Sequence, residues 1–175
     1  MLRRLCLQMF VYTQNTKIGP ISIVEEDGSI THVCFETDRL PERVYERNTA
    51  LIQNAFEQLD AYLAGQLRTF NLPLLPKGDW FRQKVWDAVS QCKFGVTVSY
   101  KDIACQIGYP RVLRATGAAI RRNPIPIFIP CHRVIKNNGA ISGYRGGVEL
   151  KVRLLALEQN HNLAGRICAT NKSSR

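Results

Sequence analysis

A cysteine followed directly by a histidine and an arginine is the first feature of this sequence that could do chemistry. The three residues are Cys131, His132 and Arg133. A cysteine attacks as its thiolate, and a neighbouring base or positive charge lowers the pKa of the thiol. Because adjacent side chains usually diverge, we expect His132 to act on the cysteine through a water molecule. The pattern predicts a nucleophilic cysteine, and a buried structural thiol beside a surface histidine is the alternative.

A histidine that acts as a base needs an acceptor that orients its other ring nitrogen. Glu158 is one candidate, because it ends a predicted last helix that spans about residues 148–158. Sequence spacing alone leaves this pairing open.

The first half of the chain, residues 1–76, predicts a small α/β domain with a sheet and a helix. Apolar residues flank Asp27-Gly28 within residues 21–35, which is typical of a β-hairpin. Apolar positions recur with helical spacing over residues 42–64, and Gly65 is a suitable residue to end that helix.

The second half, residues 77–175, predicts a mostly helical domain. Ser99, with Asp102 three residues later, is typical of a helix start that the serine caps. A helix over residues 100–107, a turn with Gly108 and Pro110, and a helix over about residues 111–122 follow. This order predicts a helix-turn-helix, and an ordinary helical hairpin with a solvated basic face is the alternative. Beyond about residue 161 the tail is polar, and we expect it to fray.

Three prolines precede the cysteine, and a glycine-rich segment follows it. Pro124, Pro126 and Pro130 exclude a helix and a central strand, so we expect an extended, stiff chain up to Cys131. The glycines of residues 139–147 predict a flexible or tightly turned loop.

Positive charge is confined to the second half of the chain. The protein has 24 Lys and Arg against 14 Asp and Glu, a net charge of +10. Residues 1–76 carry a net charge of −2 and residues 77–175 carry +12. A basic domain suggests a polyanionic partner, most often nucleic acid, although a solubility feature is the alternative. The better candidate for touching DNA is the second helix of the helix-turn-helix, which carries Arg111, Arg114, Arg121 and Arg122.

Length and cysteine usage narrow the class of protein. A chain of 175 residues is long enough for a core without disulfides or metal. The six cysteines include no Cys-x-x-Cys pair, and the N-terminus lacks a signal-peptide pattern, so we expect an intracellular protein with mostly buried, reduced thiols. His32 and Cys34 do not have the spacing of common zinc ligands, and we predict no metal. No apolar run approaches the about eighteen residues of a membrane span.

The run Ile129-Pro130-Cys131-His132-Arg133-Val134-Ile135 resembles the active-site signature of the O6-alkylguanine-DNA alkyltransferases, also called methylated-DNA–protein-cysteine methyltransferases. Four more motifs follow the order and spacing of this family: Phe94-Gly95-x-x-x-Ser99-Tyr100, Arg122-Asn123-Pro124-Ile125-Pro126, Ser142-Gly143-Tyr144-x-Gly146-Gly147 and Leu154-Leu155-Ala156-Leu157-Glu158. The resemblance is strong over residues 77–160. Residues 10–76 match in general shape, up to Tyr62-Leu63-Ala64-Gly65. The fold it implies is an α/β N-terminal domain followed by a mostly α winged helix-turn-helix domain.

The resemblance implies a methyltransferase that acts once, on itself. Cys131 would take the alkyl group from guanine O6 as a stable thioether, and no cofactor is needed because the DNA brings that group. His132 would take the cysteine proton through a water, and Glu158 would orient His132. Asn123 would brace the site, and Tyr100 would donate a proton or hydrogen bond to the departing guanine.

The resemblance also implies how DNA binds. The damaged base must leave the duplex, and the second helix would enter the minor groove with Arg114 filling the vacated stack. Such binding is largely independent of sequence. Arg111, Arg121, Arg122 and Arg133 complete the expected DNA-binding set. We expect a cytoplasmic monomer, nucleoid-associated in a bacterium, that binds double-stranded DNA carrying alkylated guanine, with O4-alkylthymine as an open second substrate.

The expected substrate pocket combines backbone and side chains. The carbonyls of Cys131 and Val134 would read the guanine amino group, and the loop of residues 143–147 would close over the base. Its main-chain amides near Arg145 and Gly146 would face O6, and Tyr144 would form a wall of the alkyl pocket. Arg145 stands where some relatives have a small residue, so we expect it to contact phosphate or to narrow the pocket.

Two other functions remain open. A non-catalytic winged-helix DNA-binding protein explains the charge and the helices but not the Pro-Cys-His-Arg-Val signature. A cysteine hydrolase normally has its histidine far along the sequence from the cysteine, and it leaves the basic helix unexplained.

Overall fold

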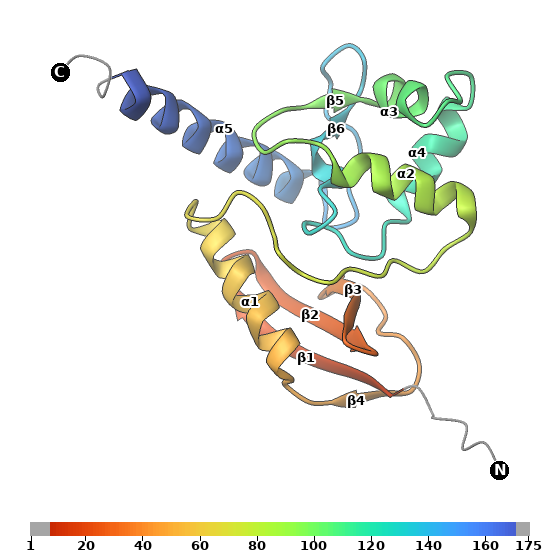
Figure 1. Ribbon diagram of the computed structural model, residues 1–175, viewed down its shortest axis with the longest axis vertical. Helices are drawn as coiled ribbons and strands as arrows, with labels where there is room; N and C mark the ends of the chain where they lie inside the picture. The colour runs from red at the N-terminus through yellow and green to blue at the C-terminus, as the bar shows by residue number, and fades with distance from the viewer. Residues whose placement is uncertain (1–7, 171–175) are drawn as a thin grey trace.

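A mixed four-stranded sheet with one helix forms the first half of the structure (Figure 1). The computed structural model describes residues 8–170, with side chains up to residue 161. The strands are β1 (Met9–Thr16), β2 (Gly19–Glu26), β3 (Ser29–Phe35) and β4 (Val44–Glu46), in the order β3-β2-β1-β4. β1–β2 and β2–β3 are antiparallel, and β4 runs parallel to β1. The α/β fold and the hairpin turn at Asp27-Gly28 are confirmed, and both turn residues have positive φ.

Helix α1 (Ala50–Leu63) packs its apolar face on this sheet. It begins later than the predicted residue 42, because the Thr49 side chain caps it by accepting from the Ile52 amide at 3.2 Å. The preceding residues form β4 instead. Gly65 follows the helix with φ +75°, and a Cβ there would also meet the His161 ring.

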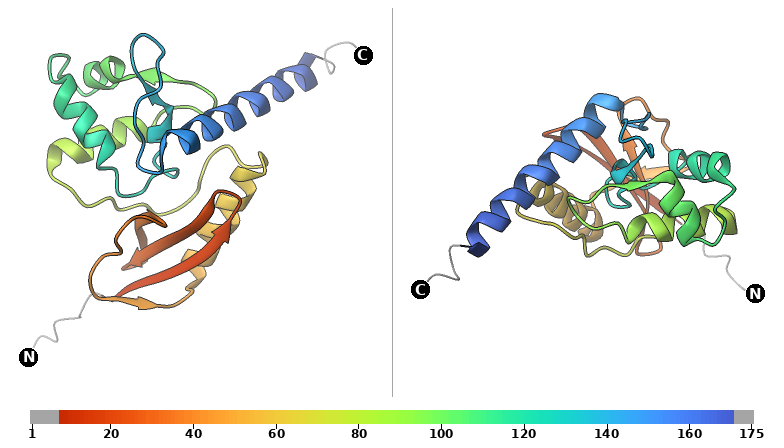
Figure 2. Two further views of the ribbon diagram at one scale, coloured as in Figure 1. Left: turned by 180° about the vertical axis from the view of Figure 1, so that it is seen from behind. Right: turned by 90° about the horizontal axis from the view of Figure 1, so that it is seen from above.

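Helices dominate the second half, as predicted. They are α2 (Trp80–Ser90), α3 (Tyr100–Gln106), α4 (Leu113–Arg121) and α5 (Val148–Thr170). The Ser99 capping box starts α3, and the turn after it leads into α4. The Trp86 indole donates to the Ala119 carbonyl at 2.9 Å and holds α2 on α4. α5 continues past the predicted end at Glu158 and extends away from the other elements (Figures 1 and 2).

The proline segment before Cys131 is a buried turn and not the extended chain that its composition predicted. The Ile129 amide donates to the Ile125 carbonyl at 2.9 Å, and Ile127 has φ +75°. Asn123 closes this turn, because its side chain accepts from the Ile125 amide at 3.0 Å and donates to the Ile129 carbonyl at 2.9 Å. The chain then enters a single 3₁₀ turn, η1 (Cys131–Arg133).

The two halves share an interface behind η1. The Val33 amide in β3 donates to the Pro124 carbonyl at 2.9 Å. Aromatic rings of Tyr62, Phe70 and Phe128 pack in series, with centroids 5.1 and 4.8 Å apart. Strands β5 (Val98–Ser99) and β6 (Val134–Ile135) pair in parallel next to η1. Within residues 8–170, no helix has the length and apolar character needed to cross a membrane.

Candidate active site

Cys131 starts η1 and is only 5% exposed. Its sulfur accepts a hydrogen bond from Asn123 Nδ2 at 3.2 Å, so the residue that closes the proline turn also fixes the thiol. Burial raises the pKa of Cys131, although the Asn123 bond and the nearby Lys151 charge oppose this shift. The resting sulfur is therefore a thiol, and forming the thiolate requires a base.

His132 and Glu158 lie side by side in the interior. His132 Nε2 is 2.9 Å from Glu158 Oε1, and the side chains are 0% and 1% exposed. A carboxylate only accepts hydrogen bonds, so Nε2 carries the proton and Nδ1 has a free lone pair in the neutral ring. Nδ1 is buried without a hydrogen-bond partner among the described residues. Burial also lowers the pKa of His132, which keeps the ring neutral and able to accept a proton.

Arg133 neutralises Glu158 from inside the protein. Its guanidinium contacts both carboxylate oxygens at 2.9–3.1 Å, and its side chain is 6% exposed. Burial raises the pKa of Glu158, but hydrogen bonds from His132 and Arg133 outweigh this and lower it to about 2. The expectation that Arg133 contacts DNA is wrong, because its guanidinium is buried in an ion pair. Sequence could not reveal this, since the acidic partner lies far along the chain.

Tyr62 is a site residue that the sequence reasoning missed. It comes from α1 in the first half, is fully buried, and donates its hydroxyl proton to Glu158 Oε1 at 2.7 Å. A tyrosine at the core-facing end of a helix usually signals packing. Its place in the Tyr62-Leu63-Ala64-Gly65 motif was the only signal available.

Tyr100 and Tyr144 line the narrow pocket that Cys131 also lines. The Tyr100 hydroxyl is 2.6 Å from Ser142 Oγ. The Tyr144 ring packs edge-on against His132 and Phe35, and its hydroxyl is buried without a partner among the described residues. Both tyrosines line a narrow pocket of about 10 Å³ beside Cys131. A guanine cannot enter a space of that size.

The glycine-rich loop contacts the first half of the molecule. A Cβ on Gly146 would lie 2.8 Å from the Phe35 ring, and Gly147 has φ +89°. The Arg145 guanidinium donates to Asp38 and to the Asn123 carbonyl, each at 3.1 Å. The Arg145 side chain thus joins Asp38 of the first half to Asn123 of the second, and it lines the narrow pocket beside Cys131.

Lys151 is a second residue that sequence reasoning missed. It is 1% exposed and donates to the Val134 carbonyl at 2.6 Å. Lys151 thereby ties α5 to the strand that follows η1.

A larger groove of about 550 Å³ adjoins the narrow pocket, and the two share Tyr100 and Arg121. Arg114 and Leu113 also line this groove, and Leu113 is 42% exposed. The four arginines proposed for DNA contact on and around α4 are exposed: Arg111, Arg114, Arg121 and Arg122.

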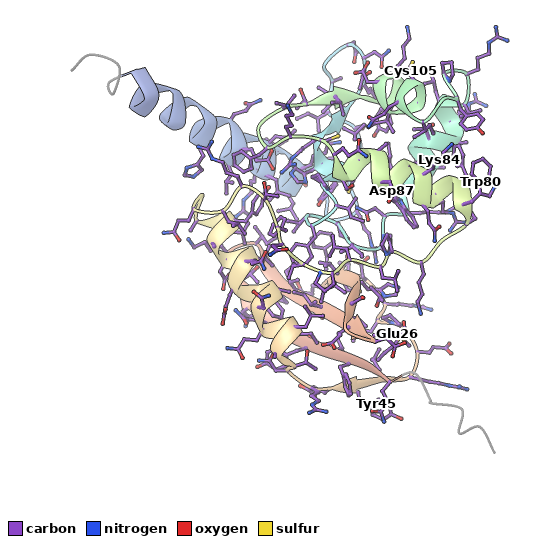
Figure 3. All side chains as sticks on the ribbon, viewed as in Figure 1. Glu26, Tyr45, Trp80, Lys84, Asp87 and Cys105 are labelled. Carbon is purple, nitrogen blue, oxygen red and sulfur yellow. The ribbon has the colours of Figure 1, made fainter. Side chains whose placement is uncertain are left out.

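Among the described cysteines, Cys34, Cys92 and Cys131 are buried and free, and Cys105 lies at the surface of α3 (Figure 3). Cys6 and Cys168 lie outside the described side chains. Within residues 8–161, no three His, Cys, Asp or Glu side chains are grouped to hold a metal.

Known proteins match both halves of the chain. Residues 9–76 match the 6-O-methylguanine DNA methyltransferase ribonuclease-like domain, and residues 80–160 match the DNA binding domain of the same family. A constitutive methylated-DNA–protein-cysteine methyltransferase of Bacillus subtilis is 40% identical over 84% of this chain and 93% of its own length. A Methanosarcina barkeri relative is also 40% identical, over 82% and 93%.

Solved structures agree with these matches. The Mycobacterium tuberculosis O6-methylguanine methyltransferase has a TM-score of 0.82 and 38% identity, covering 88% of this chain and 94% of that one. The structure of Mycobacterium tuberculosis OGT in complex with DNA has a TM-score of 0.81 and 37% identity, covering 87% and 94%. The chain therefore belongs to the 6-O-methylguanine DNA methyltransferase family and is a methylated-DNA–protein-cysteine methyltransferase of DNA repair.

Proposed function

We propose that Cys131 is the alkyl acceptor and that each molecule reacts once. The thiolate attacks the carbon bonded to guanine O6, a carbon–sulfur bond forms, the carbon–oxygen bond breaks, and its electron pair stays on guanine. The product thioether is a poor leaving group, so the sulfur is not regenerated. The observation that carries this proposal is a buried thiol, held by Asn123 at 3.2 Å, in the residue before the His132–Glu158 pair.

His132 removes the thiol proton in this proposal. Its Nδ1 is the free basic atom, and the buried hydroxyl of Tyr144 also has no partner among the described residues. Buried polar atoms normally have a protein or water partner. One water between Nδ1 and the sulfur would carry the proton, and the Glu158 carboxylate would stabilise the imidazolium that forms.

Tyr100 assists the leaving group. Tyr100 lines both the groove and the narrow pocket, so a base passing from one to the other meets its side chain. Donating a hydrogen bond to the departing guanine would stabilise the negative charge that develops there. Ser142 holds this hydroxyl at 2.6 Å and would have to release it.

The damaged base reaches the site from outside the duplex. We propose that α4 enters the minor groove, that Arg114 fills the space of the rotated base, and that Arg111, Arg121 and Arg122 contact phosphates. The exposed arginines and the groove at α4 support this. The narrow pocket must widen for guanine, so the loop of residues 143–147 moves on binding and then closes over the base, with Tyr144 beside the alkyl group.

The partner is double-stranded DNA with alkylated guanine, bound largely independently of sequence, and the related OGT in complex with DNA supports this choice. We further propose a division between the two domains near residue 76, which the family matches at 9–76 and 80–160 support. A monomer working on DNA in the cytoplasm completes the proposal.

Intact mass tests the acceptor. Mixing the protein with a duplex that carries one O6-methylguanine should add one methyl group, about 14 Da, to each molecule and no more, because the product is stable. Cys131→Ala should abolish the gain. Cys92→Ala, which removes another buried thiol, should retain it.

Repeated turnover, or methylation of Cys131→Ala, would contradict this assignment. DNA binding without any mass change in the wild type would favour the second candidate, a non-catalytic DNA-binding protein.

A further inference from the structure

Tyr62, in the first half of the chain, contacts both His132 and Glu158. Its hydroxyl oxygen lies 2.7 Å from Glu158 Oε1 and 3.3 Å from His132 Nε2. The side chain is fully buried, and its ring is packed by Phe70 and Phe94 at 5.1 and 6.1 Å. Tyr62 is thus held rigidly against both members of the pair by a helix of the other domain.

Counting protons fixes what each atom does. Glu158 can only accept, so the single Tyr62 hydroxyl proton goes to the carboxylate. The Tyr62 oxygen can then only accept from His132, whose Nε2 proton is shared between the carboxylate and the phenol oxygen. Both acceptors hold the proton on Nε2 and leave Nδ1 bare. Nδ1 is the atom that must be bare if His132 is to take a proton from the cysteine.

The charge balance also involves Tyr62. Burial and the Glu158 charge raise the pKa of Tyr62 far above its ordinary value, so the phenol stays protonated. A donor on the carboxylate draws electron density from it and weakens its hold on an imidazolium. His132 is faced by groups from η1, α1, α5 and the glycine-rich loop, namely Cys131, Arg133, Tyr62, Glu158, Lys151 and Tyr144.

We propose that Tyr62 is a positioning residue of the alkyl transfer, contributed by the N-terminal domain, which holds His132 in the Nε2–H form and moderates its basicity through Glu158. This inference rests on the proposed function of Cys131 and His132. It assigns a part in the chemistry to a domain that otherwise lies behind the site.

Tyr62→Phe tests the inference, because it removes one oxygen and keeps the ring. Rates are measured from pH 5 to 9 with free O6-benzylguanine, so that DNA binding and base rotation are bypassed. We expect a roughly tenfold slower reaction on the plateau, from the loss of a buried hydrogen bond. The pH at which the rate falls on the acid side should rise by about half a pH unit. Without the tyrosine hydroxyl as a donor, the Glu158 carboxylate stabilises the imidazolium more strongly.

Tyr12→Phe is the matched control. Tyr12 lies in the same domain and packs on Phe56, and its hydroxyl makes no hydrogen bond to a described residue. We expect its profile to coincide with that of the wild type. A Tyr62→Phe profile that coincides as well, or that drops equally at every pH, would overturn the inference and leave Tyr62 a packing residue.

Nitrogen-15 NMR of labelled histidine gives a second readout in the full chain, which has three histidines. The wild-type His132 ring should be neutral with its proton on Nε2 at pH 7, and Tyr62→Phe should show some of the other tautomer or an upward-shifted titration. A wild-type ring with its proton on Nδ1 would overturn the inference even if Tyr62→Phe failed to fold. If the wild type does not methylate itself at Cys131, the proposed function fails; if it does and Tyr62→Phe behaves like Tyr12→Phe, the inference alone fails.

Discussion

Glu158 holds together residues that are far apart in the sequence. Its carboxylate accepts from Tyr62, His132 and Arg133 and from the Gly95 amide at 2.8 Å. A buried charge is tolerated only when such partners surround it. Arg133 balances that charge, so the carboxylate can orient a neutral His132 and still stabilise the imidazolium of the proposed mechanism.

This arrangement predicts how stability depends on pH. The pKa of Glu158 is lowered to about 2, so its stabilising contribution is complete above the unfolded value near 4.5 and is lost as the pH falls toward 2. The shift corresponds to about 3 kcal/mol. Glu158→Gln should lower the free energy of unfolding at pH 7 by at least that amount, because Arg133 is left as an uncompensated buried charge.

Urea unfolding between pH 2 and 7 measures the effect. The wild-type and Glu158→Gln curves should converge as the pH drops from about 4.5 to 2. Glu57→Gln on the exposed side of α1 serves as the control, and we expect it to follow the wild type throughout. A constant gap between the wild type and Glu158→Gln would mean that the stabilisation does not come from this charge.

The proposed role of helix α4 is to bind DNA, and it takes no part in the proposed chemistry at Cys131. Arg114 is exposed on it and lines the groove, away from the thiol. Arg114→Ala should therefore slow repair of a duplex, which needs base rotation, far more than reaction with free O6-benzylguanine. Single-turnover rates on both substrates measure the ratio.

Arg47→Ala removes the same charge from the first half, where Arg47 stacks on Phe10 at 5.2 Å, and should change neither rate. Equal losses on duplex and free base in Arg114→Ala would show that Arg114 does not act in base extrusion.

Elements with clear local signals were predictable from the sequence. The capped start of α3 and the Asp27-Gly28 turn have such signals, because capping and turn chemistry involve neighbouring residues. β1 was missed because its sequence is an apolar run over residues 9–12 followed by a polar run over residues 13–16, without the alternation that predicts a half-buried strand. The proline turn was missed because Asn123 closes it with side-chain bonds that composition does not show.

At the site, the same rule holds. Motifs pointed to Cys131, His132 and Glu158, whereas Tyr62 and Lys151 join the candidate site through contacts between distant parts of the chain. Arg133 was misassigned because a basic residue is usually solvated, and only the fold reveals that Glu158 meets it inside.

The two halves of the molecule differ in net charge and in the contacts that they make. The first half, net −2, holds the site from behind through Tyr62 on Glu158 and Asp38 on Arg145. The second half, net +12, carries the exposed arginines of α4. Because the positive charge is confined to one half, the field of the protein orients that half toward DNA before a lesion is met.

Binding to undamaged duplex should therefore weaken steeply with salt, because each phosphate contact releases a counterion. Fluorescence anisotropy of a labelled duplex between 50 and 300 mM KCl gives the slope of log K against log salt concentration. Arg122→Ala should reduce that slope by about one, since one phosphate contact is lost, and Arg47→Ala should leave it unchanged. A wild-type slope near zero would exclude the basic half as a phosphate-binding surface. If the wild-type slope is steep and only Arg122→Ala leaves it unchanged, then Arg122 does not contact a phosphate. The wild-type slope thus tests the basic surface as a whole, and the Arg122→Ala slope tests the placement of one side chain.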